Sequence, residues 1–222
     1  MIPLKDDAPT SSFPFVTLSI IAINIAVFVY EMTLGAERLS AFVLSTAVIP
    51  HEIVSMGGIR PIVPLPLTLF SAMFVHGGLL HVGGNMLFMW IFGDNIEDRF
   101  GHFKFIVFYL GAGLAASLTQ ILVDPSSMTP MIGASGAVAG VLGAYFLLFP
   151  AANVKTLVFL VFFVSVVKIP AVIFLGVWFL MQIASSSYGG GIAWYAHIGG
   201  FVAGIATVLV FLRKKRSRSA YR

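Results

Sequence analysis

The sequence predicts an all-α membrane protein with six transmembrane helices, and three observations carry that prediction. Hydrophobic residues make up 59% of the 222 positions, whereas 13 basic and 9 acidic residues make up only 10%, against roughly 25% charged residues in soluble domains. Several uncharged stretches approach the roughly 20 residues that cross the hydrocarbon core of a bilayer. Six of the 13 basic residues lie in the last ten positions, which suits lipid headgroups better than nucleic acid.

The expected membrane domain, residues 15–212, lies between two short tails. Residues 1–14 are polar and carry three prolines without a signal-peptide pattern. Residues 213–222 hold the basic cluster and are expected to form a basic cytoplasmic tail. Charges and prolines interrupt the apolar runs and set the limits of the helices. The six spans are expected at 15–34, 81–96, 103–123, 132–149, about 169–183 and 192–212.

Two segments between the spans are unusual. Residues 35–80 are mostly apolar, but their prolines exclude one continuous helix, so a large first loop is expected. Residues 154–167 precede Lys168 and Pro170 and are expected to lie in the membrane interface or to enter the membrane only partly. Pro170 then suits the first turn of the fifth span.

The basic residues predict both termini on the cytoplasmic side. An even number of spans places both termini on one side, and putting them inside leaves only Arg38 and Arg60 outside, a division of 11 to 2. Basic residues favour cytoplasmic loops. We therefore expect a multi-pass membrane protein whose first loop faces out. The expected location is a bacterial plasma membrane.

The lack of cysteine limits the chemistry. Disulfides, thiolate nucleophiles and thiolate-bound zinc are all excluded. His76 and His81 are five residues apart and lack the glutamate of an HExxH zinc motif, so no metal site is expected. We expect no cofactor and no nucleic-acid partner.

Three polar clusters lie near the outer ends of expected spans, where polar groups are costly and are commonly functional. Span two carries His76, His81 and Asn85, span four begins with Gly133-Ala134-Ser135-Gly136, and span six carries His197. The alternating spans place all three clusters at one depth. His81 and Asn85 share a helix face, and Ser135 lies in a first helical turn, where free N–H groups favour an anion.

These residues supply the parts of a serine hydrolase. Ser135 would be the nucleophile, and a neutral His197 could accept its proton and later donate it to a leaving amine. Asn85, His81 and the Ser135 backbone N–H could donate to the oxyanion. No carboxylate is expected within the spans at that level, so a Ser-His dyad remains.

Each residue also has a purely structural explanation. A serine among small helical residues is commonly a packing residue, and a histidine within a bundle can be satisfied by neighbouring helices. Gly136, Gly200 and Gly204 belong to small-xxx-small patterns that bring helix backbones close. Such packing would itself carry Ser135 to His197.

The clusters resemble the motifs of the rhomboid family of intramembrane serine proteases, in the family's order and on its second, fourth and sixth spans. The resemblance covers about residues 15–212 and extends to the connection 93–101. It implies a six-helix rhomboid-like bundle whose first loop lies partly in the outer leaflet. It also implies that the fifth span and residues 184–191 control substrate access, with the glycine run 189–191 as a mobile cap. The matching residues are His76-x4-His81-x3-Asn85, Gly133-Ala134-Ser135-Gly136 and Ala196-His197-x2-Gly200-x3-Gly204.

The same resemblance implies Ser135 as nucleophile and His197 as base, with His81 and Asn85 assisting the oxyanion. Two positions depart from the family pattern. Many members carry a Trp-Arg pair in the first loop where this chain has Leu67 and Thr68, so the resemblance does not specify how this loop is anchored. Some members stack a Tyr on the catalytic His one turn after the nucleophile, where this chain has Ala139. Tyr145 and Tyr195 are the remaining candidates for that support.

The sequence thus predicts an intramembrane serine endopeptidase that cleaves single-span membrane proteins near the outer leaflet and contacts membrane lipids. The alternative is an inactive rhomboid-like protein that binds membrane helices for quality control, and retention of both Ser135 and His197 argues against it. A small transporter or channel would commonly carry functional acidic residues within its spans or show inverted repeats. We expect neither in this chain, which disfavours this alternative. The residues specify neither a physiological substrate nor an oligomeric state.

Overall fold

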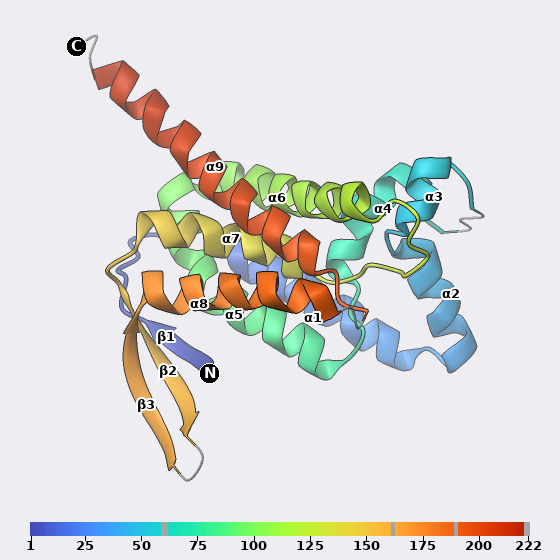
Figure 1. Cartoon of the computed structure of the whole chain (residues 1–222), viewed down its shortest axis with the longest axis horizontal. Coiled ribbons are helices and arrows are strands. Elements are labelled where there is room, and N and C mark those ends of the chain that lie inside the picture. Colours follow the sequence, from blue (N-terminus) through green and yellow to red (C-terminus); the bar gives the residue numbers. More distant parts are fainter. Residues whose placement is uncertain (59–61, 161–162, 189–190, 220–222) are drawn as a thin grey trace.

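The protein is mostly helical, and its long helices run alternately in opposite directions (Figure 1). The computed structural model describes residues 1–58, 62–160, 163–188 and 191–219. The elements are β1 (Ile2–Asp6), α1 (Phe15–Thr33), α2 (Ala36–Thr46), α3 (Pro50–Ser55), η1 (Leu65–Leu67), α4 (Thr68–Ser71), η2 (Ala72–Phe74), α5 (Leu79–Phe100), α6 (His102–Val123), α7 (Ser135–Leu148), β2 (Asn153–Leu160), β3 (Phe163–Pro170), α8 (Ala171–Ser185), η3 (Ser186–Tyr188) and α9 (Trp194–Ser219).

The two ends of the helical bundle differ in what they carry. At one end, which we call the sheet end, α5 and α7 finish, α6 and α8 begin, and the three strands gather. At the other, which we call the site end, α5, α7 and α9 begin and the short helices α2, α3 and α4 lie to one side (Figure 1).

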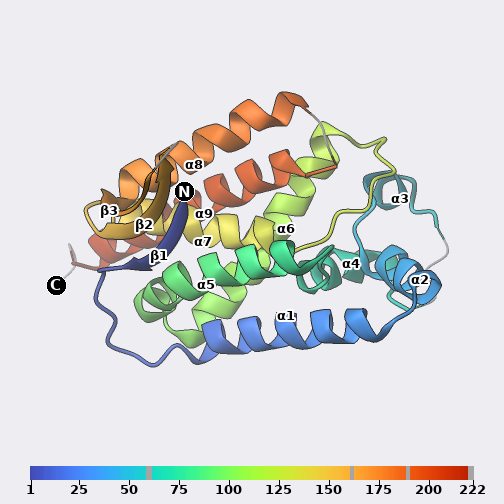
Figure 2. The same ribbon diagram turned by 90° about the horizontal axis from the view of Figure 1, so that it is seen from below.

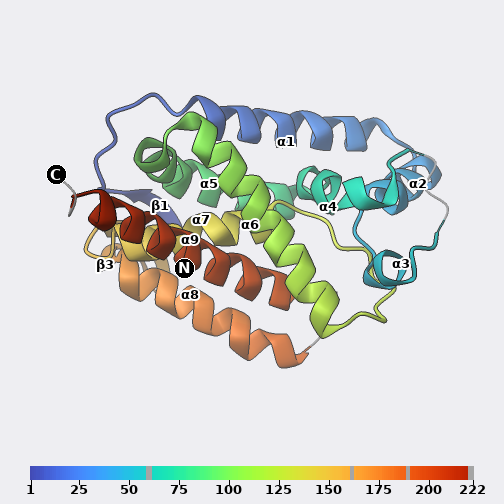
Figure 3. The ribbon, with the colours of Figure 1, turned by 90° about the horizontal axis from the view of Figure 1, so that it is seen from above.

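Helix α7 occupies the centre of the bundle, with α5, α6, α8 and α9 around it (Figures 2 and 3). All its residues from Ala137 to Tyr145 are buried. Glycines make this burial feasible: a Cβ atom at Gly143 would lie 2.0 Å from the carbonyl oxygen of Phe201, and one at Gly204 would lie 2.0 Å from the carbonyl oxygen of Gly140. The backbones of α7 and α9 therefore touch, as the small-xxx-small pattern predicts.

Two described helices, α1 and α6, are each long and apolar enough to cross a bilayer. A third candidate is the pair Leu65–Phe74 and Leu79–Phe100, which is bent by 81°. The apolar helices α7 and α8 and the part Trp194–Val210 of α9 are shorter. The described part of the chain therefore contains helices of membrane length but does not establish six full spans.

The helix expected at 132–149 is shorter than predicted, because α7 begins only at Ser135. Gly133 has φ of +114°, a left-handed conformation that cannot continue an α-helix. With 14 residues, α7 is about 21 Å long, shorter than the roughly 30 Å of a hydrocarbon core.

The prediction of an all-α fold is wrong in one region, the sheet. The described residues of 154–167, expected near the membrane interface, form the strands β2 and β3, and β1 from the expected polar tail pairs with β2. The order is β1-β2-β3, antiparallel throughout. The segment is rich in valine, which favours strands, and pairing satisfies backbone groups that an isolated apolar chain would leave open. At the other terminus, α9 continues through part of the expected basic tail and ends at Ser219.

The described parts of the expected first loop, 35–58 and 62–80, form short helices and turns held to the bundle by hydrogen bonds. Ser71 Oγ donates to the carbonyl oxygen of Thr46, and the Gly133 N–H donates to that of Ala72. Thr68, at the position where the resemblance would imply Arg, is buried and donates to the carbonyl oxygen of Leu65. These contacts anchor the segment without a Trp-Arg pair.

Polar groups at the sheet end bind one another. The Glu97 carboxylate accepts the backbone N–H groups of Val16 and Thr17, which lie in the first turn of α1 and have no partner within that helix. The Tyr145 hydroxyl donates to the carboxylate of Asp6 on β1. Burial raises the pKa of Asp6 above its usual value, although the Tyr145 hydrogen bond opposes that shift.

Candidate active site

Ser135 is the first residue of α7 and follows a turn that only glycine fits. The segment before it pairs with the first-loop region through a bridge between Val48 and Met131, and Gly133 then turns the chain with its positive φ. A Cβ atom at Gly133 would lie 2.5 Å from Nε2 of His81. Gly133 is thus needed both for its backbone conformation and for the close approach of His81.

His197, in the first turn of α9, faces Ser135. Its Nε2 atom lies 2.8 Å from Ser135 Oγ. The distance is set by the contact between α7 and α9, because a Cβ atom at Gly200 would lie 2.1 Å from the carbonyl oxygen of Gly136. One turn along the chain, Gly204 meets Gly140 in the same way. The glycines around the motifs therefore bring the serine and the histidine together.

Gln182 on α8 holds the other nitrogen of the His197 ring. Gln182 Oε1 lies 2.8 Å from His197 Nδ1, and Gln182 Nε2 donates to the carbonyl oxygen of Trp178 at 3.0 Å. A carbonyl oxygen can only accept, so the amide must present its own oxygen to the imidazole. The proton of a neutral His197 then sits on Nδ1, and Nε2 is free to accept from Ser135.

Two indole rings flank His197. The ring of Trp178 lies with its centroid 6.2 Å from that of His197, and the ring of Trp194 meets it edge-on at 5.9 Å. These contacts support the imidazole at a site where position 139 is alanine. Neither expected tyrosine is found in this role: Tyr145 donates to Asp6 at the sheet end, and Tyr195 lines the cavity beside the site.

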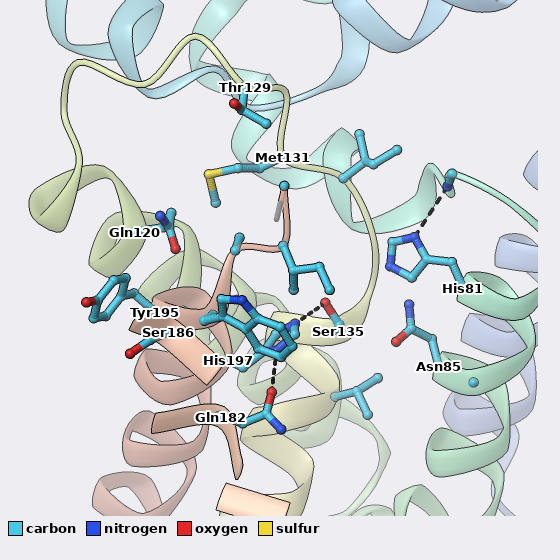
Figure 4. Close-up of a pocket in the computed structure, with 18 of the residues that line it drawn as sticks. His81, Asn85, Gln120, Thr129, Met131, Ser135, Gln182, Ser186, Tyr195 and His197 are labelled. Atoms are coloured by element: carbon cyan, nitrogen blue, oxygen red, sulfur yellow. Dashed lines mark hydrogen bonds between the residues drawn. The ribbon is translucent and has the colours of Figure 1, made fainter. Parts of the chain in front are cut away.

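His81 and Asn85 lie across from Ser135, on α5 (Figure 4). The N–H of Gly77 donates to His81 Nδ1 at 3.3 Å, so the proton of a neutral His81 sits on Nε2. That atom faces the Gly133 turn. His81 can therefore donate a hydrogen bond toward the space above Ser135, which is the property an oxyanion site requires.

His76 lies behind Asn85 and is buried. Its Nε2 atom receives the backbone N–H of Ala134 at 3.5 Å and lies 3.0 Å from Asn85 Nδ2. Because the Ala134 N–H can only donate, Nε2 of His76 is an acceptor and Asn85 donates to it. His76 thus orients Asn85 from outside the cavity.

A cavity of about 910 Å³ opens over these groups. Its walls come from α5, the segment before α7, α8 and the start of α9, and they include Ser135, His197, His81, Asn85 and Gln182 (Figure 4). The three polar clusters predicted to share one depth therefore meet at one cavity. Among the described residues, no group of three or more His, Asp or Glu is arranged to hold a metal ion.

Comparison with known proteins decides the family. A profile of the rhomboid domain matches residues 66–214, well over half of the chain. The chain belongs to the rhomboid family. Rhomboid protein 1 from mitochondria of Saccharomyces cerevisiae is 31% identical over 150 residues, which are 63% of this chain and 40% of that protein. Rhomboid protease GluP of Bacillus subtilis is 32% identical over 139 residues, 62% of this chain and 25% of that protein.

The rhomboid chain therefore spans less than half the length of these curated relatives. The family is one of membrane proteins and typically of intramembrane serine proteases. A shorter match, to RHOMBOID-like protein 5 of Arabidopsis thaliana, is 38% identical over 76 residues, 34% of this chain and 25% of that protein.

Sequence reasoning missed two polar residues of this rhomboid. Gln182 is the one amide side chain in the apolar stretch 171–185, and the cost of a polar group within a span would have singled it out. The expectation that no carboxylate lies at this level is wrong, because Glu31 of α1 is buried there and accepts the backbone N–H of His76. The glycine run 189–191, expected as a mobile cap, lies outside the described residues apart from Gly191.

Proposed function

We propose that this rhomboid is an intramembrane serine endopeptidase that uses Ser135 as nucleophile and His197 as general base. The observation that carries the proposal is the chain of two hydrogen bonds from Gln182 through His197 to Ser135, each 2.8 Å long. It gives the imidazole the tautomer that can accept the Ser135 proton. A structural serine or histidine has no need of that arrangement.

The positions of these groups support the following reaction. His197 Nε2 takes the hydroxyl proton while Ser135 Oγ attacks a peptide carbonyl carbon. Negative charge then develops on the carbonyl oxygen, on the side of the cavity where Asn85, His81 and the Ser135 N–H can donate to it. His197 gives its proton to the leaving amine, and a water activated by the same imidazole hydrolyses the acyl-enzyme.

The substrates we propose are single-span membrane proteins cleaved near the outer leaflet. Backbone groups of a transmembrane helix are all hydrogen-bonded within the helix, so a substrate must unwind locally before attack. We expect helix-weakening residues near the scissile bond for this reason. Helix α8 forms one wall of the cavity, which supports a role for α8 and the residues after it in substrate access.

We also propose the topology expected from sequence: a membrane domain over 15–212 with six spans, both termini in the cytoplasm, in a bacterial plasma membrane. The alternating directions of α1, α5, α6, α7, α8 and α9 support this arrangement (Figure 1). Reporter fusions after Thr10 and at Arg222 should both report the inside. An external report from either fusion would overturn the topology.

A fluorophosphonate probe and a reconstituted single-span substrate test the activity. The wild type should be labelled on Ser135 and should cleave the substrate, whereas Ser135→Ala should do neither. Ser186→Ala is the matched control, because Ser186 lines the same cavity but its hydroxyl donates to the carbonyl oxygen of Ile183. A folded wild type that binds the substrate without labelling or cleavage would instead be the inactive binding protein.

A further inference from the structure

One face of the three-stranded sheet carries a row of lysines. The register places Lys5 opposite Lys155 and Lys155 opposite Lys168, so the three side chains lie next to one another on the same face. All three are exposed, whereas Asp6 and Val154, which belong to the opposite face, are buried. Like charges directly opposite one another destabilise a sheet. The row therefore needs a counter-charge.

Nearby acidic groups are engaged elsewhere. Asp7 accepts hydrogen bonds from the backbone and the side chain of Asn153, and these bonds, with a smaller contribution from Lys168, hold the pKa of Asp7 below its usual range. Asp98 accepts from two serines in the segment between β1 and α1. Among the described residues no salt bridge involves any of the three lysines. Beyond the attraction between Asp7 and Lys168, the described residues supply no counter-charge to the row, so an external anion can complete it.

Beyond the lysines, the same face is apolar. The register aligns Ile2 and Val166 on either side of Leu157, and then pairs Phe159 with Val164. The exposed fraction is 41% for Ile2, 55% for Val166, 59% for Phe159 and 64% for Val164. A contiguous exposed apolar surface marks contact with a protein or a membrane. The face is thus amphipathic along the strands, with its cations near the bundle.

The position of the hairpin favours the membrane. It leaves the bundle at the sheet end and projects sideways, across the direction of α8 (Figure 1). Helix α8 follows β3 directly, and its first turn exposes Val172 and Ile173. In a membrane-embedded bundle these side chains face lipid. The hairpin therefore lies next to a lipid-facing part of α8, at the level where the helices end and headgroups begin.

We propose that the face formed by Lys5, Lys155 and Lys168 binds the headgroups of anionic phospholipids. The ammonium groups contact phosphates, and the exposed Phe159 and Val164 reach the boundary with the acyl chains. Lysines near the ends of membrane elements extend toward the headgroups in this way, with their stems along apolar surface. This surface is independent of the proteolytic site at the other end of the bundle.

The absence of cysteine from the sequence makes a site-directed spin label a clean test. The full-length protein is prepared with Val164→Cys, labelled with a nitroxide and placed in nanodiscs of phosphatidylcholine with or without phosphatidylglycerol. With the anionic lipid, the label should become more accessible to oxygen and less accessible to a water-soluble nickel complex. Ser165→Cys is the matched control, because residue 165 points to the opposite face.

Charge is tested by changing all three lysines together. Replacement by Gln should lower the affinity for anionic lipid by roughly fivefold for each lysine removed. The change in label accessibility should then need a higher phosphatidylglycerol content. Replacement by Arg should preserve the affinity. A second measurement does not depend on the label: the Gln variant should melt higher than the wild type in neutral detergent, because the repulsion is gone, and should lose that advantage in anionic discs. Inorganic phosphate should not substitute for the lipid.

Two results would overturn the proposal. One is a Val164 label that stays accessible to nickel in anionic discs, which would point to a soluble acidic partner. The other is an equal response of the Gln and Arg variants to phosphatidylglycerol, which would leave the lysines without a role. Neither result depends on whether the protein cleaves a substrate.

Discussion

The two ends of the bundle use the same kinds of polar side chain for different purposes. At the sheet end, the carboxylates of Glu97 and Asp6 accept hydrogen bonds from α1 and from Tyr145. At the site end, Ser135 and His81 keep a hydrogen-bonding atom directed at a cavity of about 910 Å³. Closed networks contribute to stability, and open donors and acceptors serve a ligand or a reaction. Substitutions at the two ends should therefore separate turnover from stability.

The largest effect is expected at the open end, from Ser135→Ala and His197→Ala. Each should reduce proteolysis by at least about 10⁴-fold, because the nucleophile and base act as one unit. The melting temperature should change little, since neither side chain fills the core. Cleavage by purified protein in proteoliposomes and thermal unfolding measure the two quantities. Substantial cleavage by either variant would remove the dyad assignment.

Asn85→Ala should have the next largest effect, roughly 10²-fold to 10³-fold on turnover, the cost of losing one oxyanion donor. His81→Ala should act similarly, and the double variant should lose less than the product of the two effects, because both donors serve one charge. Asn85 also donates to His76. If that bond were its whole purpose, the melting temperature would fall while turnover per folded molecule stayed unchanged.

Gln182→Leu should slow turnover by roughly 10-fold, because an unpaired buried N–H on His197 costs about as much as a lost buried hydrogen bond. Gln182→Glu keeps an acceptor oxygen at the same reach and should restore most of the rate. Leu175→Val on the same helix is the control for packing, since Leu175 is buried and does not line the cavity. A purely structural Gln182 would give Leu and Glu variants with similar rates.

Glu97→Ala should show the reverse pattern at the closed end. The N–H groups of Val16 and Thr17 would lose their acceptor, at a cost of about 1–3 kcal/mol in the free energy of unfolding. Turnover per folded molecule should stay the same. Glu37→Ala, at an exposed position on α2, serves as the control. A change in turnover without a change in stability would contradict the division between the two ends.

The smallest effect concerns pH. Burial raises the pKa of Asp6 above 3.8, so the folded protein holds this proton more tightly than the unfolded chain. Stability from this group is therefore present at low pH and is lost as the pH rises through the folded-state pKa. The Asn side chain of Asp6→Asn cannot ionise. The melting temperature of this variant, relative to that of the wild type, should therefore rise by about a degree or two between roughly pH 4 and pH 7. A constant difference across that range would contradict the assignment.

The sequence predicted which polar residues meet at the cavity better than it predicted the sheet, for a physical reason. Motifs on three helices specify Ser135, His197 and His81 by residue type, and the glycines that join α7 to α9 are visible in the same stretches. The valine-rich hairpin, by contrast, has the composition of a membrane segment. Nothing local distinguishes strand pairing with β1 from burial in lipid, because the deciding partner lies some 150 residues away in the chain.

Gln182 was missed for a related reason. Its significance depends on which ring it meets, and the distance between α8 and α9 is a tertiary quantity. The start of α7 was placed three residues early because apolar composition alone does not reveal the positive φ of Gly133. The close approach of His81 to that turn, which excludes any side chain there, is likewise visible only in three dimensions.

The glycine contacts between α7 and α9 also make one part of the site more rigid than the other. Ser135 and His197 lie on two helices whose backbones are in direct contact, so the distance between the two side chains is held rigidly. Gln182 lies on α8, which contacts α9 through aromatic side chains. The ring of Phe179 stacks on that of Phe201 with centroids 4.5 Å apart. Stacked aromatic rings can shift past one another more easily than two helix backbones in direct contact. A displacement of α8 would therefore break the hydrogen bond to Gln182 that fixes the tautomer of His197. It would do so before it changed the distance between His197 Nε2 and Ser135 Oγ.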